Sequence, residues 1–141
     1  MAANTSPIFS RTPDIQWVSG YMTAVNTTAD LTSGTIYLIF TADATEGGYL
    51  RKLKFRPTPA GTTTKTVARL WLNNGSTTGT AANNVPFDEV SLPAVTADAD
   101  DPTYGIEYVF DGNVPPGYRI YITLGTGTAN GWACTAFAGK Y

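Results

Sequence analysis

The amino-acid sequence predicts an all-β protein, a two-sheet antiparallel sandwich of about eight strands. Short segments of β-type residues recur along the 141 residues, and Gly, Pro, Asn or Thr interrupts them every dozen or so positions. No stretch has the period of a helix. Two loops, 76–84 and 93–103, are too long for tight hairpins and suit crossings between sheets, which favours a jelly roll. An immunoglobulin-like sandwich is the second choice, because its Cys-Trp-Cys pattern is missing.

The N-terminal part is expected to be an arm followed by a first strand. Residues 1–13 contain two prolines and no periodic pattern, which predicts an extended arm ahead of a single domain at 14–141. Ile15 and Trp17 then alternate with polar neighbours, and this alternation predicts a half-buried strand at 15–22.

The next three strands differ in how their faces are composed. Residues 35–42 are apolar on both faces, as expected of a central strand covered on each side. Residues 49–56 alternate with period two, although Arg51 interrupts the apolar face. That face carries Tyr49, Leu53 and Phe55, and the opposite one carries Lys52, Lys54 and Arg56. In the strand at 65–72, Ala68, Leu70 and Leu72 are expected inward and Val67, Arg69 and Trp71 outward.

The last four strands are expected at 87–92, 104–110, 118–124 and 131–138. In the third of these, Ile120 and Ile122 are expected inward, and Tyr121 alternates with them and is expected outward.

The residue types present are poorly suited to catalysis. The chain has no histidine and a single cysteine, so no Ser–His or Cys–His pair can form. Cys134 lies among small and apolar residues and is expected to be buried. Asp88 and Glu89 are adjacent on a strand, so they point to opposite faces and cannot act as a carboxylate pair. We expect no enzyme and no cofactor.

Charge and hydropathy limit the partners. The loop with Asp98, Asp100 and Asp101 could hold a cation, but it lacks the glycine and distal glutamate of an EF-hand, which favours a solvated loop. The net charge of −2 gives no electrostatic footprint for nucleic acid. No apolar run approaches the roughly 20 residues that span a bilayer, so no membrane partner is expected. Residues 1–6 lack the features of a signal peptide, which predicts synthesis in a cytoplasm.

Three groups of residues are candidates for partner binding. The first is in the arm and comprises Pro7, Ile8, Phe9, Arg11 and Pro13, which could gain main-chain hydrogen bonds on a neighbour. The second is the basic stripe of Lys52, Lys54 and Arg56, which is a solvated face, a charged edge against aggregation, or a contact for an acidic partner. The third is the pair of outward aromatics, Trp71 and Tyr121, which either pack under a loop or serve as binding hot spots or sugar-stacking platforms.

The C-terminal region carries a resemblance to a known class of proteins. The turn Pro115-Pro116-Gly117-Tyr118 starts a strand that ends in Leu124-Gly125-Thr126, and Gly131-Trp132-Ala133 follows. With a jelly roll, a proline-containing arm and no catalytic set, the chain resembles the small decoration or cementing proteins on the heads of tailed bacteriophages. The resemblance rests on residues 114–133, and the rest matches in strand pattern.

That resemblance implies a location and partners. Such a protein is made in the host cytoplasm and sits in the virion on the outer capsid surface, as a dimer or trimer. There it binds the major capsid protein and bridges neighbouring capsid subunits. The alternative is a tail, fibre or receptor-binding part, or a carbohydrate-binding module.

Overall fold

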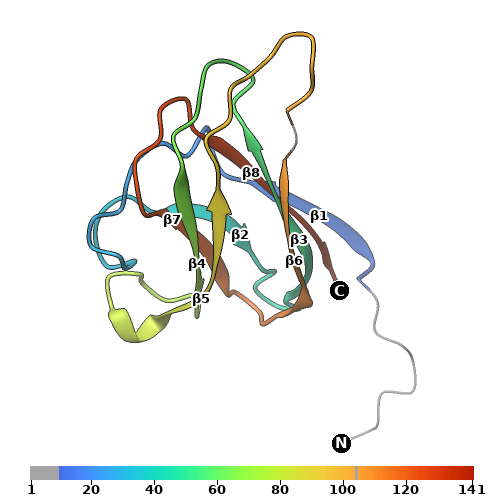
Figure 1. The fold of residues 1–141 in the computed structure, drawn as a ribbon. Helices are drawn as coiled ribbons and strands as arrows, with labels where there is room; N and C mark the ends of the chain where they lie inside the picture. Colours follow the sequence, from blue (N-terminus) through green and yellow to red (C-terminus); the bar gives the residue numbers. More distant parts are fainter. Residues whose placement is uncertain (1–9, 104) are drawn as a thin grey trace, which may run out of the picture.

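The computed structural model describes residues 10–103 and 105–141, which form two antiparallel four-stranded sheets (Figure 1). The strands are β1 (Thr12–Trp17), β2 (Tyr37–Thr41), β3 (Gly48–Pro57), β4 (Thr66–Asn73), β5 (Asn84–Leu92), β6 (Ile106–Val114), β7 (Arg119–Leu124) and β8 (Trp132–Lys140). One turn of 3₁₀ helix, η1 (Ala81–Asn83), precedes β5. All eight strands expected from the sequence are present, with shifted ends. The segment 35–42, expected to be a central strand, is instead β2 at the margin of sheet B. No helix in the described part of the chain is both long enough and apolar enough to cross a bilayer.

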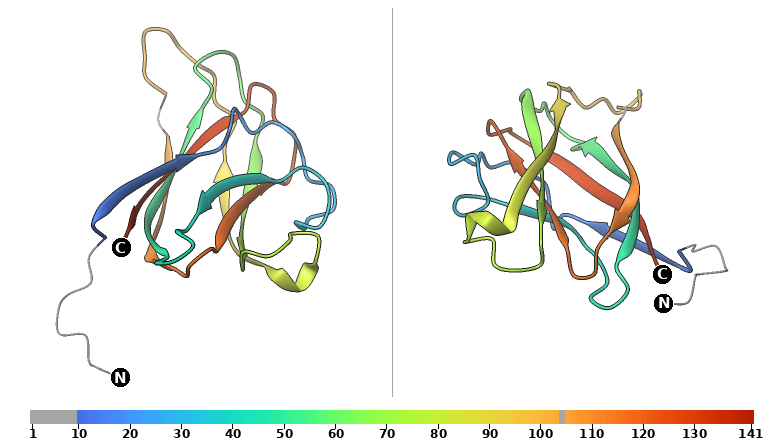
Figure 2. Two further views of the ribbon diagram at one scale, coloured as in Figure 1. Left: turned by 180° about the vertical axis from the view of Figure 1, so that it is seen from behind. Right: turned by 90° about the horizontal axis from the view of Figure 1, so that it is seen from below.

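The strand order is that of a jelly roll. Sheet A has the order β1-β8-β3-β6, and sheet B has the order β2-β7-β4-β5. The pairs β1·β8, β2·β7, β3·β6 and β4·β5 are nested, as if the chain were folded in half and then rolled up. The two sheets face each other across the core (Figure 2). The predicted two-sheet sandwich of jelly-roll type is confirmed.

The core lies between the sheets, where alternate residues of the central strands meet. Such residues of β3, β7 and β8 are fully buried, among them Leu53, Phe55, Ile120, Ile122 and Trp132. Cys134 is buried with them, as expected, and burial raises the pKa of its thiol far above its usual range.

A bulge in β3 explains the interrupted alternation of this strand. Relative to β8, β3 has an extra residue between Leu50 and Lys52. This residue, Arg51, is exposed, so that Leu50 and Leu53 both face the core despite being three residues apart. Tyr49 had been expected on the buried face, and Leu50 takes that place instead.

The first strand begins earlier and ends earlier than predicted. Thr12 and Pro13, which the sequence assigns to the arm, pair with Lys140 and Gly139 as part of β1. The strand ends at Trp17 because the chain bends at Gly20, where φ is +78°. Of the expected arm, residues 1–9 lie outside the described residues.

Candidate functional site

Four strands bring their outward side chains together on the outer face of sheet A. The pairing register forms two rows across the sheet. One row is Ile15, Phe137, Lys52 and Val109, and the other is Trp17, Thr135, Lys54 and Glu107. These eight residues, with Arg56 beside Ala133, are called here the sheet A face.

Apolar side chains of this face are strongly exposed. Trp17 is 67% exposed, Val109 66% and Ile15 51%. Single exposed apolar residues are ordinary on protein surfaces, but a group that shares one face of a sheet is typical of an interaction site. Tryptophan is also the residue type most enriched at binding hot spots.

The basic stripe lies in the middle of this face. Lys52, Lys54 and Arg56 share the outward side of β3, as the alternation predicts. Lys52 Nζ lies 2.9 Å from Glu107 Oε1 and 5.5 Å from the centre of the Phe137 ring. The hydrogen bond from Lys52, and then its charge, hold the pKa of Glu107 below its usual range. Lys54 and Arg56 form no ion pair with any described residue.

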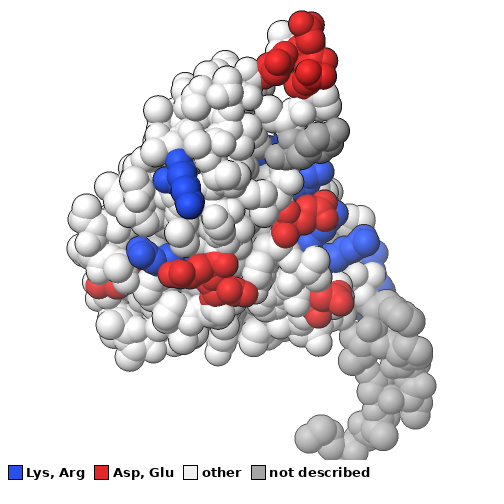
Figure 3. Space-filling view, viewed as in Figure 1, with Lys and Arg blue, Asp and Glu red and all other residues white. Residues whose placement is uncertain are grey.

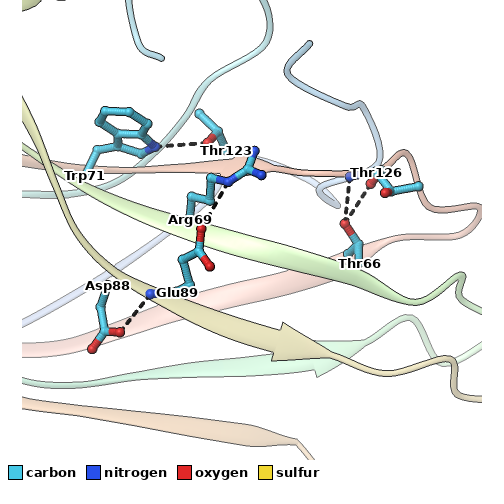
Figure 4. A network of polar contacts seen from close by, with 7 residues as sticks. All are labelled: Thr66, Arg69, Trp71, Asp88, Glu89, Thr123 and Thr126. Carbon is cyan, nitrogen blue, oxygen red and sulfur yellow. Dashed lines mark hydrogen bonds and ion pairs between the residues drawn. The ribbon is translucent and has the colours of Figure 1, made fainter. Parts of the chain in front are cut away.

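Trp71 and Tyr121, the two aromatics considered for a partner surface, are not available on the outside of the sandwich. They are only 7% and 8% exposed, and they form a second small core with Leu31 on the outer side of sheet B. Trp71 Nε1 donates a hydrogen bond to Thr123 Oγ1 over 2.9 Å (Figure 4). The prediction that they pack under a loop is confirmed, and the hot-spot alternative is wrong.

Asn26 organises the loop that covers these aromatics. Its buried side-chain amide donates to the carbonyl oxygens of Asp30, Ser33 and Thr35, at 3.0 to 3.1 Å. These hydrogen bonds hold residues 26–36 in one conformation, in which Leu31 and Ile36 contact the aromatic pair.

Sequence reasoning missed Trp17 as a surface residue. The alternation of β1 was correct, but Gln16 turns toward sheet B, and Ile15 and Trp17 turn to solvent. Gln16 shows why, because its side-chain amide pairs with both main-chain groups of Thr41 in β2 at 2.9 Å. No local pattern in the sequence signals this contact, which spans 25 residues.

The arm candidates have separate outcomes. Pro7, Ile8 and Phe9 lie outside the described residues. Arg11 is exposed next to β1, and Pro13 is exposed within β1 on the same side as Ile15 and Trp17. Pro13 therefore belongs to the sandwich and adjoins the sheet A face.

Hydrogen bonds to main-chain and side-chain groups organise several of the acidic residues. In the loop between β5 and β6, which forms the acidic tip at the top of Figure 3, Asp98 Oδ1 accepts hydrogen bonds from the main-chain N–H groups of Asp100 and Asp101. Within the described ranges, no three acidic or cysteine side chains are grouped closely enough to hold a metal ion. Asp88 accepts a 2.8 Å hydrogen bond from the hydroxyl of Tyr108. Burial, and then this hydrogen bond, raise the pKa of Tyr108 to about 12.

A shallow hollow of about 740 Å³ lies at one end of the sandwich. Tyr49 and Tyr141 contribute aromatic rings to it, Pro115 and Pro116 contribute apolar surface, and Arg11, Glu46 and Asn113 contribute polar groups. The hydroxyl of Tyr141 donates to Asn113, and that of Tyr49 donates to Asp111.

Comparisons with protein families, curated proteins and solved structures give no match for this chain.

Proposed function

We propose that this protein is a capsid decoration protein that binds the outer surface of a phage head and clips neighbouring major capsid subunits together. The observation that carries the proposal is the sheet A face, where exposed Trp17 and Ile15 lie on one side of a basic stripe and exposed Val109 lies on the other. A face of this composition suits binding to another protein surface, with the tryptophan as anchor and the cations setting orientation.

The composition agrees with a surface protein of an assembly. Only 14% of the residues are charged, and much of the surface in Figure 3 carries neither acid nor base. A clip across a subunit seam adds binding free energy that must be lost before the seam opens. Because a shell presents the same seam many times, modest affinity at each site is sufficient.

The direct test is binding to purified heads of the parent phage that lack the protein. We expect saturable binding at a fixed ratio to the major capsid protein and a rise in the temperature at which the heads disrupt. Trp17→Ala should lower the affinity at least about tenfold, because truncating a hot-spot residue removes 2 kcal/mol or more. Leu38→Ala is the matched control, since Leu38 is an exposed apolar residue of sheet B. Absence of binding by the wild-type protein would refute the proposal.

A saccharide-binding role is the second candidate, and the hollow beside Tyr49 and Tyr141 favours it. Two aromatic rings next to a guanidinium, a carboxylate and an amide offer both stacking and hydrogen bonding, as a sugar requires. A glycan array, followed by titration of any hit against Tyr141→Ala, tests this role. Binding that depends on Tyr141 but not on Trp17 would favour a receptor-binding module.

A further inference from the structure

β1 has a free edge whose hydrogen-bonding groups can be assigned from the register. Val18 N donates to Cys134 O, and the β1·β8 register continues from there without a shift. Even-numbered residues of β1 therefore bond to β8, and the main-chain groups of Pro13, Ile15 and Trp17 point away from it. Within the described residues these outward groups have no hydrogen-bond partner. β1 forms the margin of sheet A (Figure 2).

The other three edge strands are protected. Gln16 caps both main-chain groups of Thr41 in β2. β5 contains Pro86 and a bulge, and β6 contains a bulge and the exposed acids Glu107 and Asp111. Prolines, bulges and charges are the usual means of preventing strand addition. On the outer face of sheet A, β1 carries only the apolar side chains of Pro13, Ile15 and Trp17, which are all exposed.

The outward edge of β1 is complementary to itself. In an antiparallel pairing about a two-fold axis at Ile15, the Ile15 residues of two copies face each other, and Trp17 of each copy faces Pro13 of the other. The N–H groups of both Ile15 residues then donate to each other's carbonyl oxygens, and each Trp17 N–H donates to the opposite Pro13 carbonyl. Every outward donor is used, because proline has none. The side chains of Ile15 and Trp17 would also gain apolar neighbours across the axis.

We propose that two copies of this chain associate through their β1 edges in this register, so that the two A sheets form one continuous eight-stranded sheet. The interface is isologous, as expected for a closed homodimer. The inference does not depend on capsid binding, because it rests on the β1 edge alone.

Site-specific disulfide formation tests the register. Directly opposite residues in a hydrogen-bonded antiparallel pair have Cα atoms about 5.5 Å apart, within the range that a disulfide bridges. We expect Ile15→Cys to give a covalent dimer under mild oxidation, on a non-reducing gel. Pro13→Cys is the matched control, since the two copies of residue 13 would be about 14 Å apart and should not crosslink. The natural Cys134 is buried and should not contribute. Equal crosslinking of both variants would overturn the register.

Sedimentation of the full chain tests the association itself. We expect the wild-type protein to sediment at twice the 15.0 kDa mass of one chain. Ile15→Pro should be monomeric, because it removes an edge donor that β8 does not use, and its melting curve should show that it still folds. Ile15→Thr keeps the donor and should remain dimeric. A wild-type monomer or trimer at every concentration would refute the proposal, whatever the result of capsid binding.

Discussion

At the scale of single residues, the buried contact between Trp71 and Thr123 joins β4 to β7 beneath the covering loop. The indole N–H of Trp71 is removed from water and has the hydroxyl of Thr123 as its partner. A buried donor without an acceptor lowers the stability of the folded state, so the loss of this hydrogen bond should lower the free energy of unfolding by more than the bond itself contributes.

Thr123→Val tests this contact, because valine has nearly the same shape but no hydroxyl. We expect the free energy of unfolding to fall by about 1–3 kcal/mol, measured by urea denaturation. Trp71→Phe removes the donor, so the double variant should lose less than the sum of the two single losses. An additive result would show that the two side chains do not interact.

Asn26 is a second residue on which the covering loop depends. Its amide contacts three carbonyl oxygens, so Asn26→Ala should expose Trp71 and shift the tryptophan emission to the red, with a loss of stability of about 1–3 kcal/mol. Asn74→Ala is the control, because Asn74 is exposed and its side chain contacts only its own turn and Asn83. Equal effects of the two substitutions would argue against a special role for Asn26.

At the scale of elements, the two sheets are linked at one margin by β1 and β2. Gln16 is the linking residue, because its side-chain amide makes the two hydrogen bonds to Thr41 that a neighbouring strand would otherwise make. At the opposite margin, Phe87 of β5 packs against Tyr108 and Phe110 of β6, with ring centres 6.4 and 5.8 Å apart. The sandwich is thus closed by a polar contact on one side and by aromatic packing on the other.

Gln16→Ala should loosen the polar margin. We expect hydrogen exchange at the Thr41 amide to accelerate at least about tenfold, since this N–H loses its acceptor. The amide of Gly125, which donates to Val67 O, is the internal reference and should not change. Unchanged exchange at Thr41 would mean that another group protects it.

At the scale of the whole molecule, the folded state stabilises several ionised carboxylates. Main-chain N–H groups of Glu46 and Thr45 lower the pKa of Asp43, and the hydroxyl of Tyr108 lowers the pKa of Asp88. Lys52 does the same for Glu107. A carboxyl group with a lowered folded-state pKa contributes stability above its unfolded value, and this contribution is lost as the pH falls further.

The protein should therefore be sensitive to acid and insensitive near neutrality. The ordinary pKa values of the groups concerned are 3.8 for Asp and 4.5 for Glu, so we expect the melting temperature to fall as the pH is lowered through this range. Because the chain has no histidine, the melting temperature should stay constant between about pH 6 and 8. A marked transition in that interval would contradict this assignment.

Of the two long loops expected to cross between the sheets, 93–103 does so, whereas 76–84 joins β4 to β5 within sheet B. The sequence was sufficient for the eight strands, because alternation and turn residues are local signals. It was not sufficient to place the surface aromatics. Trp71 and Trp17 both lie outside the space between the sheets, and only the loop organised by Asn26 makes one buried and leaves the other exposed. The bulge at Arg51 was visible in the sequence as broken alternation. Which neighbouring residues it turns toward the core depends on the pairing with β8, which is distant in sequence.

β8 is the last strand in chain order, yet it lies between β1 and β3 in sheet A. During synthesis, β1 has no partner in sheet A until β8 has been made, and β3 has only β6. Ala136 and Cys134, which lie opposite Leu53 and Phe55, become available only then. Sheet A therefore cannot be completed before residues 132–140 have been synthesised, and a partly made chain that lacks them leaves one edge of β3 open to other strands.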